Sequence, residues 1–168
     1  SIVCFIITAV MGFSMAGRSG VGQHFLMGFF TTFLVALAQS MTMFFFIGTG
    51  KQVKDLVANH PAGKEYIQRT KVFKARAFPP ATWAILFTMA TMIIGGGVDT
   101  HVRWTPAFLH ALLAAVAFYY NILAFWREAK HMIQQNMLMD EVERLLVAPI
   151  AGAPPNPHSD GTPASPVP

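Results

Sequence analysis

The chain has 168 residues, of which 54% are hydrophobic and only 12% are charged. About a quarter of the residues of a soluble domain carry charge, so this composition excludes a protein whose main solvent is water. The formal net charge is +4, but the basic residues are unevenly placed along the chain. Their placement therefore indicates orientation in a membrane and not a nucleic-acid partner.

Long apolar runs predict membrane-spanning helices, because a helix needs roughly 20 apolar residues to cross the hydrocarbon core. The predicted spans are residues 2–17, 24–47, 80–98 and 105–126. The first run is the shortest and ends in small residues, so a cleaved signal peptide is its competing interpretation; the lack of a basic segment before it argues against cleavage. We therefore expect an all-α integral membrane protein with four transmembrane helices.

Two short polar segments set the order of the predicted helices. Residues 17–23, with three glycines, join the first two spans, and residues 99–104 join the last two. Segments this short connect neighbouring antiparallel helices. The sequence therefore predicts an up-down-up-down four-helix transmembrane bundle with its longest connection on one side.

That longest connection, residues 48–79, is basic and partly helical in the prediction. Lys51–Asn59 is expected to continue the second helix, and Lys64–Ala77 is expected to form a basic amphipathic helix. Basic residues near a membrane surface attract anionic lipid headgroups by about 1 kcal/mol each. We expect the connection to lie against anionic headgroups and to bind no nucleic acid.

The distribution of the twelve lysines and arginines predicts which face is cytoplasmic. Ten of them lie in residues 48–79 or after the fourth span, and only Arg18 and Arg103 belong to the opposite face. Loops rich in Lys and Arg stay in the cytoplasm. We therefore expect residues 48–79 and the C-terminus to be cytoplasmic, in a bacterial inner (plasma) membrane.

The fourth helix is predicted to run beyond the membrane, as a cytoplasmic extension over residues 127–148. Apolar residues recur there at helical spacing, at Met132, Met139, Val142 and Leu146. Such a stripe packs against another helix, either the helix of the connection or a second copy of the chain. Residues 1–148 then form the membrane domain, and the Pro-rich residues 149–168 are predicted to be a disordered tail.

Two histidines are the strongest candidates for a functional site. His24 and His110 lie near the outer ends of the second and fourth predicted spans, and ionisable residues at membrane depth are candidates for function. The two spans run in the same direction, so the imidazoles are expected at similar heights. Two facing imidazoles can ligate one haem iron from both sides, which makes these residues candidate haem-iron ligands.

Small and basic residues near the histidines fit the same hypothesis. Gly28, Ala114 and Gly96 are expected to leave room for a flat macrocycle, and Arg18 and Arg103 are placed to pair with its propionates. Stripes of small residues are also the ordinary means by which membrane helices approach one another. Plain helix packing with interfacial histidines and no cofactor is therefore the alternative.

A second polar patch is predicted in the inner half of the spans. It consists of Gln39, Ser40 and Thr42 on the second span and Tyr119, Tyr120 and Asn121 on the fourth. Hydrogen bonds among such groups hold membrane helices together. Binding of a quinone headgroup is the other interpretation of this patch.

The predicted architecture resembles the small four-helix cytochrome b anchors of membrane oxidoreductases, in which histidines from two helices ligate haem and electrons pass to quinone. This chain has one histidine pair, so the resemblance implies at most one haem b. It also implies a subunit that carries electrons for a catalytic partner and is not an enzyme on its own. The alternative is a cofactor-free structural or assembly protein that docks a partner subunit, or a second copy of itself, through its cytoplasmic helices. A transporter is disfavoured because the spans lack buried charge and paired broken helices.

Overall fold

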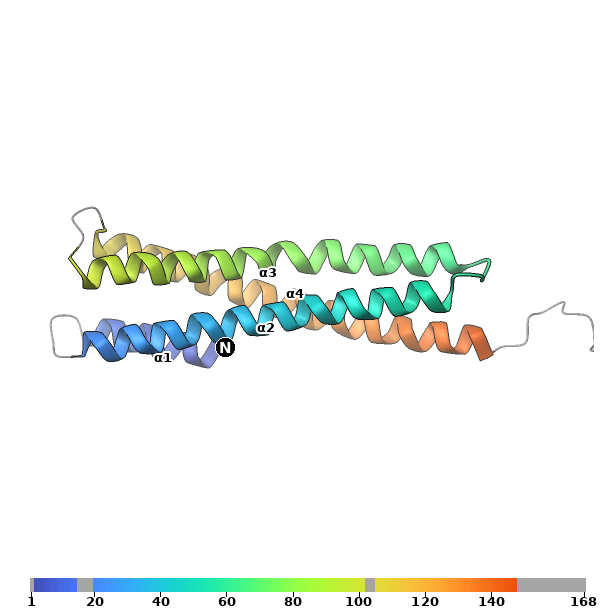
Figure 1. Cartoon of the computed structure of the whole chain (residues 1–168), viewed down its shortest axis with the longest axis horizontal. Helices are drawn as coiled ribbons and strands as arrows, with labels where there is room; N and C mark the ends of the chain where they lie inside the picture. The colour runs from blue at the N-terminus through green and yellow to red at the C-terminus, as the bar shows by residue number, and fades with distance from the viewer. Residues whose placement is uncertain (1, 15–19, 102–104, 148–168) are drawn as a thin grey trace, which may run out of the picture.

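The computed structural model describes residues 2–14, 20–101 and 105–147. Within these ranges the chain is helical and contains no strand. The helices are α1 (Ile2–Ser14), α2 (Val21–Leu56), α3 (Gly63–Asp99) and α4 (Ala107–Val147) (Figure 1). In this view α2 and α4 begin at the same end of the molecule and α3 ends there.

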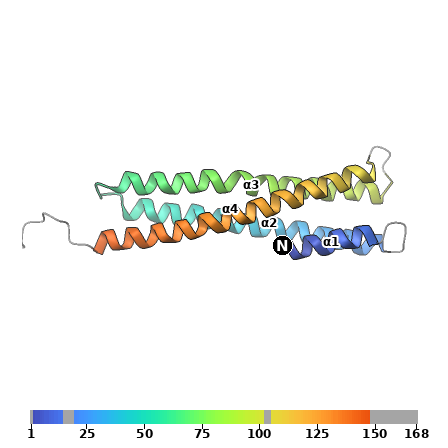
Figure 2. The ribbon, with the colours of Figure 1, turned by 180° about the vertical axis from the view of Figure 1, so that it is seen from behind.

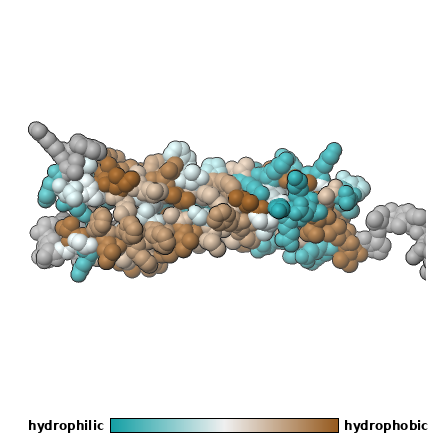
Figure 3. Space-filling view, in the orientation of Figure 1, coloured by the Kyte–Doolittle hydropathy of each residue, from teal (hydrophilic) through white to brown (hydrophobic). Residues whose placement is uncertain are grey.

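The three longest helices are long and apolar enough to cross a membrane. They have 36, 37 and 41 residues, and at about 1.5 Å per residue each exceeds the roughly 30 Å of the hydrocarbon core. α1 is a shorter apolar helix of 13 residues. Apolar side chains cover most of the surface visible in Figure 3, and polar ones gather toward the end where α2 meets α3. The apolar surface is consistent with lipid contact and indicates an integral membrane protein.

The predicted connection 48–79 consists almost entirely of helix. Its two expected helical pieces are the end of α2 and the beginning of α3, and only residues 57–62, with Pro61, separate them. Pro79 and Pro80 lie inside α3 and do not interrupt it. Prolines are tolerated in helices that are held by packed neighbours, and α3 packs against both α2 and α4.

The helices pack differently at the two ends of the molecule. α4 begins beside the end of α3 and crosses the molecule obliquely (Figure 2). α1 lies beside the first part of α2 and also contacts α4. Four helices therefore meet at the end that holds His24 and His110, and three helices meet at the opposite end.

At the three-helix end, the core is apolar and joins α2, α3 and α4. Val53, Val57, Leu138 and Val142 are buried, and Tyr66, Ile67, Phe73 and Met139 pack against them. The partner of the extended α4 is thus the beginning of α3 together with the end of α2, within one chain. Val142 and Met139 of the predicted stripe face this core, whereas Leu146 is exposed and Leu138 was not included in the stripe.

Candidate functional site

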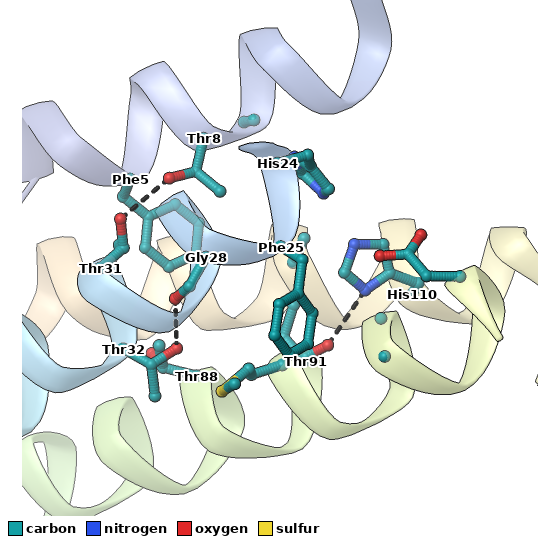
Figure 4. Close-up of a pocket in the computed structure, with 16 residues that line it drawn as sticks. Phe5, Thr8, His24, Phe25, Gly28, Thr31, Thr32, Thr88, Thr91 and His110 are labelled. Atoms are coloured by element: carbon teal, nitrogen blue, oxygen red, sulfur yellow. Dashed lines mark hydrogen bonds between the residues drawn. The ribbon is translucent and has the colours of Figure 1, made fainter. Parts of the chain in front are cut away.

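His24 and His110 lie side by side although 86 positions separate them in the sequence. Each is in the first turn of its helix, and α2 and α4 start at the same end of the molecule. The ring centroids are 6.2 Å apart and the ring planes are inclined by 87°. Figure 4 shows the two rings turned toward one another, His24 from α2 and His110 from α4.

This separation matches the geometry of two imidazoles on one iron. Metal–nitrogen bonds to histidine measure about 2.0 Å, and the ring centre lies roughly 1.1 Å behind the bound nitrogen, so two opposed ligands have ring centres about 6.3 Å apart. An imidazole plane stands upright on a macrocycle whatever its rotation about the metal–nitrogen bond. The two rings meet edge to face, with their planes inclined by 87°.

His110 is oriented by α3. Its Nδ1 lies 3.0 Å from the carbonyl oxygen of Thr91, and a carbonyl only accepts, so Nδ1 carries the proton and Nε2 keeps its lone pair. Histidines that ligate metals typically donate their other ring nitrogen in this way. A Cβ on Gly95 would lie 2.7 Å from Cε1 of His110, so only glycine at position 95 leaves the ring its place.

His24 is enclosed by α1 and lacks a comparable hydrogen bond. A Cβ on Gly12 would lie 2.9 Å from Cε1 of His24, so the ring lies directly against the backbone of α1. Its Nδ1 is buried and has no partner among the described residues. An unpaired buried polar atom costs about 1–3 kcal/mol and indicates a group that the polypeptide itself does not satisfy.

Both rings line a large apolar groove between α1 and α4. The groove has a volume of about 1060 Å³, at the upper end of the roughly 300–1,000 Å³ typical of ligand pockets. Asp99 and His101 are polar residues in its lining. The aromatic and small residues in its walls are Phe5, Ala9, Gly12, Phe13, Phe108, Ala111, Ala114, Ala115 and Phe118. The Phe5 and Phe118 rings, 5.5 Å apart between centroids, connect α1 to α4 across it. The groove is the right size and polarity for a macrocycle.

A smaller pocket of about 80 Å³ adjoins the groove and also touches both histidines. Gly28, Gly96 and Ala114, which were predicted as binding residues, line this smaller pocket, and Ala114 lines the groove as well. The predicted propionate partners Arg18 and Arg103 lie outside the described residues. The structure thus brings five of the seven predicted residues together.

Sequence reasoning missed three contributions to the site. The Thr91 group that contacts His110 is a backbone carbonyl, for which no side-chain signal exists. The pairing of Gly12 and Gly95 with the two imidazoles depends on how the helices rotate, which the sequence does not reveal. Asp99 lines both pockets, and its position as an acid at the end of an apolar span was the available signal.

The donor set suits a macrocycle better than a bare metal ion. Among the described residues, no group of three or more His, Cys, Asp or Glu side chains gathers where a metal ion would bind. Zinc in proteins needs three or four protein ligands, whereas a porphyrin supplies four nitrogens itself and asks the protein for two. Two histidines alone are the complete protein set for a haem iron.

Below the histidines, hydrogen bonds tie the helices together. The Thr8 and Thr31 hydroxyls lie 2.9 Å apart, joining α1 to α2, and the Asn121 amide donates to the Thr88 hydroxyl at 3.0 Å, joining α4 to α3. Farther along, the Gln39 amide donates to the Glu128 carboxylate. Asn121 and Gln39 of the predicted polar patch are therefore engaged with protein groups.

No protein-family model and no curated protein matches this sequence, and no solved structure matches the chain. Relatives therefore supply no residue roles. What the site does has to be inferred from its geometry, above all from the two facing imidazoles.

Proposed function

We propose that this protein is a small membrane subunit that holds one haem b between His24 and His110 and carries electrons for a partner. The observation that supports it most is the pair of imidazoles, from two helices, with ring centroids 6.2 Å apart. When bound, the haem supplies one-electron redox chemistry. The protein would supply two imidazole ligands and an apolar groove, with the His110 ring oriented by the Thr91 carbonyl.

Each residue of the site has a distinct task in this proposal. His110 would ligate the iron through Nε2, with its proton held on Nδ1 by the Thr91 carbonyl. His24 ligates from the α2 side and is kept in place by α1. Ala114 leaves room for the macrocycle in the groove, and Gly28 and Gly96 line the smaller pocket beside it. Arg18 and Arg103 would pair with the propionates.

The proposal includes an orientation. The helices cross the membrane up-down-up-down, the α2–α3 turn and the end of α4 form cytoplasmic extensions, and the histidine pair lies near the outer face of a bacterial inner membrane. The bias of Lys and Arg toward residues 48–79 and the end of α4 supports this. The basic residues contact anionic headgroups, and the extensions dock the catalytic partner.

The test is the reduced-minus-oxidised visible spectrum of the full-length protein, purified in detergent after expression with ample haem. We expect the spectrum of a six-coordinate b-type haem, and we expect this six-coordinate form to be absent from both His24→Ala and His110→Ala. His60→Ala, in the α2–α3 turn at the opposite end, is the matched control and should leave the spectrum unchanged. A flat spectrum in the wild type, or a spectrum indifferent to both substitutions, contradicts the proposal.

A cofactor-free scaffold is the second candidate. It is favoured by an exposed apolar face of α4 beyond residue 126, where the predicted fourth span ends. Ile133 and Met137 are 62% and 60% exposed there, one turn apart on one face of the helix. Exposed apolar side chains outside the lipid indicate a protein contact. A flat spectrum together with a stoichiometric partner whose retention is lost in an Ile133→Asp, Met137→Asp variant would support the scaffold.

A further inference from the structure

The two histidines of the proposed haem site are held with unequal strength, and His110 is held more firmly. Its Nδ1 donates to the Thr91 carbonyl at 3.0 Å, and its ring lies against Gly95. α3 also lies close to a residue that precedes α4, since a Cβ on Gly97 would lie 2.7 Å from Cγ2 of Thr105. The α3–α4 pairing also continues along the whole length of both helices.

His24 shares with His110 the close contact to a glycine, here Gly12 of α1, but it lacks the hydrogen bond. Its Nδ1 has no hydrogen-bond partner among the described residues. The ring is covered by α1, which has 13 residues and packs on the outer half of the molecule alone. The groove opens beside it, and two of its lining residues near His24, Val21 and Phe13, are 45% and 82% exposed.

Outer hydrogen bonds matter for metal ligation because they fix the ring and raise its basicity. Losing such a bond typically lowers metal affinity 10–100-fold. By this measure the His24 ligand is about 10–100-fold weaker than the His110 ligand. The groove of about 1060 Å³ gives the weaker ligand a space into which it can move.

We infer that His110 is the fixed axial ligand and His24 the displaceable one, so that a small neutral ligand entering through the α1–α4 groove replaces His24 on the iron. This inference rests on the proposed function. The exchange is a ligand substitution in which the coordinate bond from His24 breaks and one to the incoming ligand forms, with no electron transferred. Carbon monoxide, which binds only reduced iron, is the probe.

The experiment adds carbon monoxide to the reduced, haem-loaded, full-length protein and follows its visible spectrum. We expect a shift to a carbon-monoxide complex in the wild type. The His24→Ala protein is expected to retain haem in a five-coordinate form, to bind carbon monoxide more tightly by roughly tenfold or more, and to regain a six-coordinate spectrum when imidazole is added. The His110→Ala protein is expected to bind haem about 10–100-fold more weakly than His24→Ala.

Gly12→Ala and Gly95→Ala form a matched pair that leaves both histidines in place. Gly12→Ala places a methyl group against the His24 ring and should strengthen carbon-monoxide binding. Gly95→Ala places one against the His110 ring and should reduce haem occupancy. The inference is overturned if the haem-loaded wild type does not bind carbon monoxide, or if the two His→Ala proteins have equal or reversed haem affinities. Either result leaves the haem proposal standing. A wild type that takes up no haem refutes both.

Discussion

Each imidazole of the site lies against a glycine of a neighbouring helix. The two pairs are His24 with Gly12 of α1 and His110 with Gly95 of α3. A methyl group at either glycine would lie within 3.0 Å of ring atoms that are also confined by their own helix. The positions of both rings are therefore set by the absence of two Cβ atoms.

Gly95→Ala is expected to displace His110 and to break its hydrogen bond to the Thr91 carbonyl. Overpacking of this kind costs about 1–3 kcal/mol, and the haem occupancy should fall with it. Gly48→Ala is the control, because a Cβ there meets nothing within 4 Å and alanine is favoured over glycine in a helix by up to about 1 kcal/mol. Thermal unfolding in detergent and the haem-to-protein ratio measure both effects, and equal stability of the two variants would contradict the geometry.

Gln135 is a polar side chain at a buried position where an apolar residue is expected. It is fully buried in α4, and neither amide atom has a partner among the described residues. An unsatisfied buried polar group costs about 1–3 kcal/mol. Gln135→Leu should therefore raise the free energy of unfolding by a similar amount.

The control for Gln135→Leu is Leu138→Ala, nearly one turn along the same buried face. It removes a fully buried side chain from the α2–α3–α4 core and should cost about 2–5 kcal/mol. Both variants are compared by thermal unfolding in detergent. Destabilisation by Gln135→Leu would show that the amide has a stabilising role that its contacts within the described residues do not reveal.

At the scale of the elements, one ion pair joins the start of α3 to the end of α4. Arg69 donates to Glu141 at 2.5 Å, outside the apolar band, with both side chains partly exposed. The guanidinium holds the pKa of the Glu141 carboxyl below its ordinary value. The pair is therefore intact at neutral pH and is lost as the pH falls through that lowered pKa.

Arg69→Ala is expected to cost less than about 1 kcal/mol at neutral pH, because exposed ion pairs are screened by water. The lowered pKa of Glu141 fixes the sign of the pH dependence of the stability difference between wild type and Arg69→Ala. Wild type should be the more stable above the ordinary glutamate pKa of about 4.3, and the difference should vanish at more acidic pH. Thermal unfolding of both proteins between neutral and acidic pH measures this, and a difference that grows on acidification would be inconsistent with the pair.

The sequence predicted the elements better than their ends. Apolar runs locate α2, α3 and α4, since a span must be long and apolar wherever it lies. The predicted third span began at Pro80, but packing of α3 against two neighbours keeps the helix continuous through both prolines. The predicted apolar stripe on α4 included Leu146, which is exposed, and missed Leu138, which is buried. A helix that crosses its neighbours obliquely changes which of its faces it buries along its length.

At the scale of the whole molecule, the site depends on four helices that the chain connects only at their ends. The level of His24 and His110 was predictable, because two helices that begin at one end of a molecule bring their first turns to the same height. Their rotation was not, since it depends on which small residues of α1 and α3 meet the rings. The groove was equally unpredictable, because it arises from the oblique course of α4 past α1.

The central claim is that one chain holds one haem between these two histidines. The most direct measurement is the molar ratio of haem to polypeptide in the purified full-length protein, after expression with ample haem. We expect a ratio close to one for the wild type and for His60→Ala, and a ratio near zero when His24 and His110 are both replaced by alanine. A wild-type ratio near zero, or a ratio that survives the double replacement, would contradict the account.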